Sequence, residues 1–211
     1  MNLPLAWSEA CDRNKQPILE VLLEVLPSRG RILEIGSATG QHVVHFAAAL
    51  PGWVWQPSDQ AAYLPDLEAR LRAEGGVNIE PAITLDVARD FPEGPYDAVY
   101  SSNTSHIMSW PEVQAMFAGV GGVLRVEGLF CLYGPFNENG EFTAPSNAAF
   151  DRQLRQRNPS MGLRDLADLE TLGRQHHLFL QQRFPLPANN QLLVFVRRPE
   201  SASTRTDGKP A

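Results

Sequence analysis

Three acidic residues each lie near the end of a segment that is expected to form a β-strand. Glu34 lies in "RILEI", Asp59 ends "WVWQPSD", and Asp86 follows the apolar residues of "ITLDV". In an open α/β sheet, ligands bind beyond the carboxyl ends of the strands. Asp59 comes nineteen residues after Gly40, the spacing at which an acid accepts hydrogen bonds from ribose hydroxyls. Asp86 could accept one from an adenine amine, so the three acids together indicate a nucleoside ligand.

The loop between the first of these strands and the next helix has the sequence "GSATG", residues 36–40. Two glycines are equally typical of any strand-to-helix turn, but the loop lacks the middle glycine of the G-x-G-x-x-G dinucleotide fingerprint. The negative charge of Glu34 is unfavourable beside phosphates and favourable beside a cation. The loop therefore favours S-adenosylmethionine, which carries a sulfonium and an ammonium group, over a dinucleotide.

The hydrophobic pattern predicts the elements that position these residues. Helices are expected from Asn14 to Leu26 with Pro17 in the first turn, over 41–50 and 63–74, and from Pro111, Ser146 (as N-cap) and Leu163. Strands are expected at 31–35, 53–58, 79–85, 96–102, 128–134, 178–186 and 191–198. Five strands that alternate with helices form a parallel sheet, and a final pair with a short connector is antiparallel.

This order predicts an α/β fold of the Rossmann-like class I methyltransferase type. It consists of a seven-stranded, mostly parallel sheet with an antiparallel last strand and helices on both faces. We expect one domain over residues 1–198 and a disordered tail over residues 199–211, which are polar and contain proline, glycine and serine.

Composition excludes several classes of function. The 211-residue chain has a formal charge of −6 and no long basic block, so no nucleic-acid partner is expected. No apolar stretch approaches the about 18 residues of a membrane span, and the first residues do not form a signal peptide. Cys11 and Cys131 have no metal-ligand spacing, and His42 and His45 lack further donors nearby. We therefore expect a cytoplasmic protein without a metal, of unknown oligomeric state.

Several motifs resemble those of S-adenosylmethionine-dependent class I methyltransferases and, more narrowly, of the methyltransferase-like protein 26 family. They are "RNKQPILEVL", "GQHVVHFA", "WQPSD", "HIMSW", "LYGPF", "TAPSNAAFD", "GLRDL" and "PANNQLLVF". The similarity covers roughly residues 8 to 197. It departs at Ala38, where that family usually has glycine at the centre of the loop.

The resemblance implies a set of cofactor-binding residues for S-adenosylmethionine. By position these are Glu34, Gly36, Ser37, Ala38, Gly40, His42, Asp59, Asp86, Val87 and Asn103. Glu34 and the two glycines would line the methionine and ribose part, Val87 would pack on the adenine ring, and Asn103 would lie near the methionine end. If Ala38 needs a positive φ, it costs about 1 kcal/mol of cofactor affinity.

Methyl transfer is an in-line displacement, for which an enzyme mainly supplies proximity and alignment. His106 is the candidate general base, and the Tyr133 hydroxyl could border the acceptor; alternatively, His106 bonds Trp110 or the backbone and Tyr133 is a core residue. Candidate substrate contacts that could form a lid are Asn14, Lys15, Asn147 and Asn189. The leading hypothesis is methyl transfer to a small molecule, although a peptide tail could enter the same crevice. The alternatives are a non-catalytic S-adenosylmethionine sensor or scaffold and, less favoured, a nicotinamide-dependent oxidoreductase.

Overall fold

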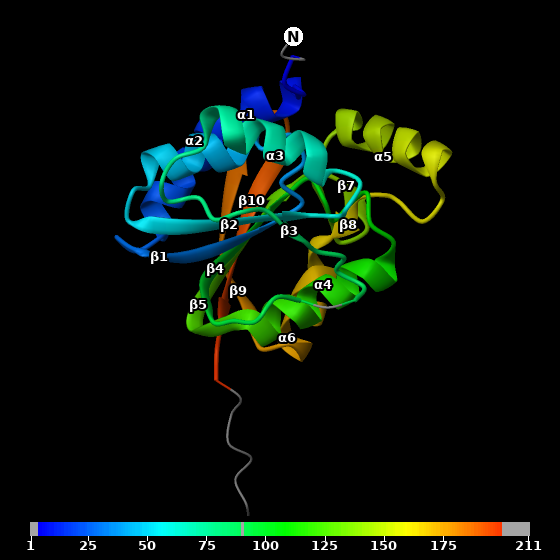
Figure 1. The fold of residues 1–211 in the computed structure, drawn as a ribbon. Coiled ribbons are helices and arrows are strands. Elements are labelled where there is room, and N and C mark those ends of the chain that lie inside the picture. The colour runs from blue at the N-terminus through cyan, green and yellow to red at the C-terminus, as the bar shows by residue number, and fades with distance from the viewer. Residues whose placement is uncertain (1–3, 90, 200–211) are drawn as a thin grey trace, which may run out of the picture.

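A seven-stranded sheet forms the centre of the computed structural model, which describes residues 4–89 and 91–199 (Figure 1). The strand order is β3-β2-β1-β4-β5-β10-β9. The strands are β1 (Gly30–Ile35), β2 (Trp53–Asp59), β3 (Ile83–Thr84), β4 (Tyr96–Ser102), β5 (Leu124–Gly134), β9 (Leu178–Leu186) and β10 (Asn190–Arg197). The pairings from β3 to β5 are parallel, and β10 is antiparallel to both β5 and β9. The predicted fold class is confirmed.

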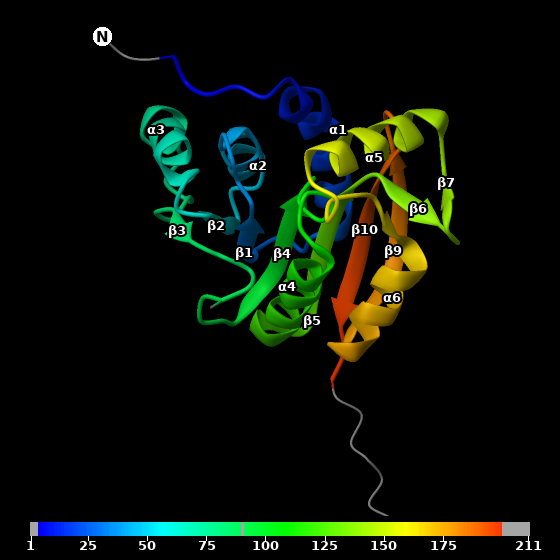
Figure 2. The same cartoon turned by 90° about the vertical axis from the view of Figure 1, so that its right-hand side faces the viewer.

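Helices cover both faces of this sheet (Figure 2). On one face lie α1 (Glu9–Val25), α2 (Gln41–Ala49) and α3 (Leu64–Glu74), and on the other lie α4 (Trp110–Val123) and α6 (Leu166–Gln175). A further helix, α5 (Pro145–Arg157), lies at the end of the sheet where β4 and β5 finish, because its Phe150 ring contacts His106 just beyond β4.

Alternation along β1 assigns its side chains to the two cores. Ile32 packs in the core beneath α1, α2 and α3, whereas Leu33 and Ile35 pack in the core beneath α4 and α6. Since successive side chains of a strand point to opposite faces, Glu34 lies on the same face as Ile32. The first predicted acid is therefore directed into the α1–α3 layer.

Three predicted helix starts are wrong. Helix α6, expected from Leu163, begins at Leu166, because the Asp165 side chain accepts a hydrogen bond from the Ala167 amide and caps the helix. Helix α1 begins at Glu9 because the Ser8 hydroxyl accepts a hydrogen bond from the Cys11 amide at 3.3 Å, so Pro17 lies inside the helix and not in its first turn. Helix α5 begins at Pro145, with Ala144 as N-cap in place of Ser146. Proline fixes φ in the helical range and suits the first helical position.

A small second sheet was not predicted. It contains β6 (Phe136–Glu138), β7 (Glu141–Phe142) and β8 (Arg164–Asp165) in the order β7-β6-β8. In the main sheet, the strand expected over 79–85 is reduced to β3, with an isolated bridge between Ile79 and Trp55. The tail expected to be disordered lies outside the described residues apart from Pro199, and the single-domain boundary stays a prediction.

Candidate functional site

The loop between β1 and α2 lies where the strand order reverses, since β1 has β2 on one side and β4 on the other. Ligands of open α/β sheets bind at such a point. Gly36 has a φ of 77°, and a Cβ there would lie 2.6 Å from Cγ2 of Thr104, in the loop after β4. Glycine therefore lets the two loops touch. Ala38 also has a positive φ, 46°, a left-handed conformation that costs an L-residue about 1–2 kcal/mol.

The amides of this loop are directed inward. Four of the five donate within the chain: Gly36 and Ser37 to the Ser58 carbonyl (both 3.0 Å), Ala38 to Oδ2 of Asp59 (2.7 Å) and Gly40 to the Ser37 carbonyl (2.8 Å). A pyrophosphate site at a helix N-terminus needs such amides free to face the ligand. Most amides of the loop are therefore already paired, and one of them is paired with the Asp59 carboxylate.

Glu34 is almost fully buried, with 1 % of its surface exposed. Its Oε2 accepts a hydrogen bond of 2.8 Å from Nε1 of Trp55. Burial raises the pKa of this carboxyl to about 8, with a further contribution from the nearby charge of Asp59. The sequence argument took Glu34 to be an anion, whereas here it is protonated near neutral pH. A cationic ligand beside it would restore the charge.

Asp59 and Asp86 lie on neighbouring segments. A hydrogen bond of 2.9 Å from the Leu85 amide to the Asp59 backbone carbonyl joins the two segments. Asp59 accepts the amides of Ala38 and Gln60, each at 2.7 Å, and burial raises its pKa. Because each carboxylate oxygen has two acceptor sites, capacity for ligand hydroxyls remains. The side chain of Asp86 is 36 % exposed and accepts the Ala88 amide at 3.0 Å. The next residue, Val87, is buried in the α4–α6 core.

A buried polar network lies beneath α1. Nε2 of His42 is 2.7 Å from Oδ1 of Asn14, and its Nδ1 is 3.4 Å from the Tyr100 hydroxyl. Burial raises the pKa of the nearby Tyr133 hydroxyl, and the Asn14 side chain offsets part of this rise. Burial lowers the pKa of His42 to about 3, so the ring is neutral. The sequence analysis did not identify Tyr100. Tyr100 is two residues from Ala98 on β4, so both side chains point to the face of the sheet that α1, α2 and α3 cover.

The loop after β4 contains His106, which is 4 % exposed. Its Nδ1 is enclosed and has no hydrogen-bond partner among the described residues. The ring packs edge-on against Phe150, with 5.1 Å between centroids, in place of the bond to Trp110 that was considered. Burial, followed by the charge of Arg164, lowers the pKa of His106 to about 4. Earlier in the same loop, Asn103 has a φ of 58° and lies just beyond β4.

Arg164 is a second residue that sequence reasoning missed. Its guanidinium donates to the backbone carbonyls of Ser105 (2.9 Å), Met108 and Ser160 (3.2 Å). Burial lowers its pKa, and the three carbonyls accept three of its five N–H donors. Arg164 therefore fixes the backbone on both sides of His106. Nothing in the local sequence signals this, because its partners in the loop are 56 and 59 residues away.

The four candidate lid residues do not lie together but occupy three separate parts of the structure. Nδ2 of Asn147 donates to the Asn189 carbonyl at 3.2 Å, which ties α5 to the turn between β9 and β10. Asn14 belongs to the network with His42. Nζ of Lys15 pairs with Asp12 at 2.5 Å, and Lys15 borders a separate cavity of about 300 Å³ with Trp7, His45 and Arg70 among its lining. The structure brings Asn147 and Asn189 together, and whether the four contact substrate stays a prediction.

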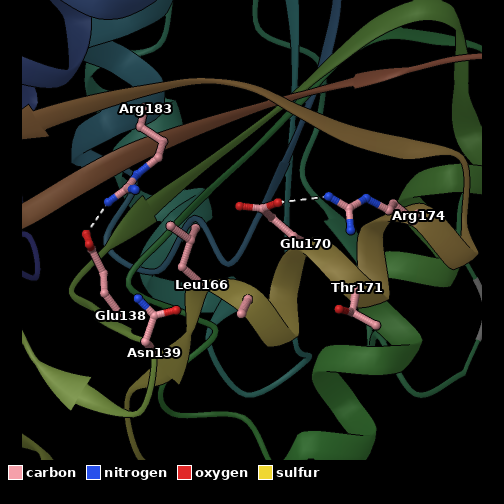
Figure 3. Close-up of a pocket in the computed structure, with 8 residues that line it drawn as sticks. Glu138, Asn139, Leu166, Glu170, Thr171, Arg174 and Arg183 are labelled. Atoms are coloured by element: carbon pink, nitrogen blue, oxygen red, sulfur yellow. Dashed lines mark hydrogen bonds and ion pairs between the residues drawn. The ribbon is translucent and has the colours of Figure 1, made fainter.

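Another cavity, of about 290 Å³, lies between the β6–β7 turn, α6 and β9 (Figure 3). Its charged residues pair with one another, Glu138 with Arg183 and Glu170 with Arg174. None of the predicted site residues lines it. In residues 4–89 and 91–199, no group of three metal-ligating side chains could hold an ion, and no helix is long and apolar enough to cross a bilayer.

A family model described as "Protein of unknown function (DUF938)" matches residues 6–197. Among solved structures, an O-methyltransferase family protein from Burkholderia thailandensis superposes with a TM-score of 0.78 at 17 % identity, covering 90 % of this chain and 58 % of that one. A putative O-methyltransferase from Nostoc punctiforme PCC 73102 gives 0.76 at 19 %, covering 88 % and 56 %.

CalO1, a methyltransferase of calicheamicin biosynthesis in its SAH-bound form, gives 0.71 at 16 %, covering 87 % and 54 %. The chain thus spans 54–58 % of the length of these three proteins. Their shared fold agrees with the strand order described above. The narrower likeness to the methyltransferase-like protein 26 family stays a prediction from the motifs. With its class I methyltransferase fold, the chain belongs to the DUF938 family.

Proposed function

We propose that this protein transfers a methyl group from S-adenosylmethionine to a small-molecule acceptor. The observation that carries the proposal is the direction of the groups in the loop after β1. Four of its five amides donate within the chain, while the carboxyls of Glu34 and Asp59 stand beside it. This arrangement disfavours a pyrophosphate and suits a ligand that has hydroxyls and positive charge but no phosphate.

The residues present fit that ligand. Gly36, pressed against Thr104, leaves no side chain between the two loops. Asp59 retains acceptor sites for the two ribose hydroxyls, and Asp86 on the neighbouring segment would meet the adenine amine. Glu34 would take the positive charge of the methionine part. The structure of CalO1 with SAH shows that this fold can hold the demethylated product.

S-adenosylmethionine would supply an electrophilic methyl group whose bonding electrons leave with sulfur. The chain's part is to position the reactants and exclude water. The hydrogen bond between His42 and Asn14 ties α2 to α1, and Arg164 fixes the loop after β4. We place the acceptor at that loop and, because several proteins of this fold are named O-methyltransferases, propose oxygen as the methylated atom.

A second candidate is a non-catalytic sensor or scaffold that binds S-adenosylmethionine. Ala38 supports it, because this residue holds a φ of 46° that glycine adopts more easily. The Ala38 amide also occupies one oxygen of Asp59. Cofactor binding without turnover of any acceptor in a broad panel would favour this candidate over the enzyme.

Calorimetry with S-adenosylmethionine and SAH tests the proposal, with Asp59→Asn as the site variant. Asparagine keeps one oxygen for the Ala38 amide but removes the charge and an acceptor. We expect binding by wild type and a loss of about tenfold or more in Asp59→Asn. Asp66→Asn, in the exposed first turn of α3, is the matched control. No binding by wild type, or equal binding by both variants, would contradict the proposed site.

A further inference from the structure

The cavity of about 300 Å³ beside Lys15, here called the α2 cavity, lies away from the candidate cofactor site. Val44, His45 and Ala48 border it from the side of α2 that faces away from the core, and Trp7 and Lys15 border it from the segment before α1 and from α1 itself. None of the predicted cofactor-binding residues lines it. Its volume is within the range of small-molecule sites, at the lower end.

The chain on both sides of Trp7 is held in place. The Ala6 carbonyl accepts a hydrogen bond of 2.7 Å from Nη2 of Arg70, a residue of α3 that is almost fully buried. The Ser8 amide donates to Oε1 of Gln41 at 2.6 Å, and Nε2 of Gln41 donates back to the Ser8 carbonyl at 3.2 Å. Figure 2 shows this segment passing α3 and α2 before α1 begins. Because the segment is already ordered, a ligand of the α2 cavity does not have to order it.

The apolar part of the lining consists of Trp7, Val44 and Ala48. Although the backbone around it is fixed, the Trp7 side chain is 59 % exposed. An indole at the edge of a cavity offers a flat apolar surface on which another aromatic ring can pack. This part of the α2 cavity therefore suits a ligand with a flat ring.

Lys15 gives the lining a positive charge that no other described residue of the lining neutralises. The other cation, Arg70, pairs with Glu74 at 2.7 Å, and both of these residues line the cavity. Nζ of Lys15 donates to Asp12, which lies outside the lining, at 2.5 Å. An ammonium group has three donors, so two remain for a ligand. The polar part of the cavity thus suits an anion.

His45 adds an unsatisfied nitrogen to the same lining. Its Nε2 is shielded from solvent and has no hydrogen-bond partner among the described residues, which is unusual because an unpaired buried polar atom costs stability. Burial, followed by the charge of Lys15, lowers the pKa of His45, so the ring adds no second charge. One ammonium beside one neutral imidazole suits a carboxylate, whereas phosphate is bound best by several charged or guanidinium donors.

We propose that the α2 cavity binds a small aromatic carboxylate, with its ring against Trp7 and its carboxylate at Lys15. The proposal does not depend on the proposed methyl transfer, because the cavity shares no residue with the predicted cofactor site. It places Lys15 in this second site and not in the lid expected over the acceptor.

Titration with benzoate, followed by NMR of the Trp7 indole and the His45 imidazole, tests the proposal. We expect both resonances to move, with a dissociation constant on the order of 1 mM or lower. Benzyl alcohol has the same ring without the charge and should bind wild type about tenfold more weakly. Inorganic phosphate should leave both resonances unchanged.

Two leucine variants on α2 test the place of binding. Ala48→Leu fills the cavity from an exposed helical position and should raise the dissociation constant for benzoate about tenfold or more. Ala49→Leu is the matched control, because Ala49 is exposed on the same helix but does not line the cavity. Leucine is a good helix former, so both variants should fold and the control should bind benzoate like wild type.

Two glutamine variants on α1 test the charge. Lys15→Gln should weaken benzoate binding about tenfold and leave benzyl alcohol binding unchanged. Arg13→Gln is the control, because Arg13 is exposed and pairs with Glu9 on the same helix. Equal benzoate binding within either pair of variants, or no movement of the Trp7 and His45 resonances, would overturn the proposal. Equal affinity of wild type for benzoate and benzyl alcohol would overturn the assignment to a carboxylate.

Discussion

The loops after β1 and after β4 lie side by side, but they differ in how many of their polar groups have hydrogen-bond partners within the chain. In the first loop, four of five amides and both oxygens of Asp59 have partners within the chain. In the second, Ser105 Oγ and His106 Nδ1 are buried without a partner among the described residues. Most polar groups of the first loop are therefore paired without a ligand, whereas the second loop has buried polar atoms that lack a partner.

This difference matches the two parts of the proposed reaction. A cofactor that is bound in every cycle gains affinity from a loop that needs no rearrangement. An acceptor is selected by the groups that remain unpaired until it binds, because an analogue without its hydroxyl leaves them unsatisfied. The comparison predicts that changes in the first loop alter stability and cofactor binding together, whereas changes in the second alter acceptor binding alone.

Gly36→Ala should have the largest effect. Alanine at a φ of 77° is strained, and its Cβ would lie 2.6 Å from Thr104. We expect a loss of about 3 kcal/mol in the free energy of unfolding and loss of SAH binding. Urea denaturation and calorimetry measure the two quantities.

Gly134→Ala, at the end of β5 beside the second loop, is the counterpart; its Cβ would meet its neighbours at 3.7 Å or more, so the free energy of unfolding should change by less than about 0.5 kcal/mol. If both glycine variants lost stability equally, the contrast between the loops would not hold.

Glu34→Gln tests the charge state of the first loop. The folded pKa of about 8 lies above the ordinary value for glutamate, so the folded state holds a proton that the unfolded state releases. Wild type should therefore lose stability as pH rises from about 4.5 through 8. The substituted glutamine has no such proton and can still accept from Trp55, so the variant should be more stable than wild type by about 2 kcal/mol at pH 9. Urea denaturation across this pH range measures the difference.

The same substitution should weaken S-adenosylmethionine binding, because an amide cannot become an anion beside a cation. Glu24→Gln, on the exposed side of α1, controls for the loss of one carboxylate. Parallel pH–stability curves for Glu34→Gln and wild type would show that Glu34 is already charged in the folded state.

Much of the fold could be predicted because each element carries its own pattern. Strands such as 96–102 are apolar runs, and the turn at Ala188 and Asn189, both with positive φ, joins β9 and β10 as the short connector indicated. The small sheet could not be predicted, because strands of two residues such as Arg164–Asp165 have no periodicity to detect.

The places of the acidic residues along the strands could be predicted from the sequence, but their protonation could not. Acids at the ends of strands are visible in the sequence, and the structure places Asp59 and Asp86 on neighbouring segments. That Glu34 is protonated follows from its burial, which depends on the tertiary structure and raises its pKa more than the hydrogen bond from Trp55 lowers it. Likewise, the role of Arg164 arises from carbonyls that are distant in sequence.

Ala38→Gly should have a small effect of the opposite sign to Gly36→Ala. Glycine removes the strain of a φ of 46° but is more flexible when unfolded, so the net gain in stability should be about 0.5–1 kcal/mol. The Ala38 amide donates to Asp59, so easier adoption of this conformation should also tighten SAH binding by about two- to fivefold. Calorimetry and thermal unfolding measure both. Unchanged SAH binding, or a loss of stability, would show that the conformation at Ala38 does not limit the cofactor loop.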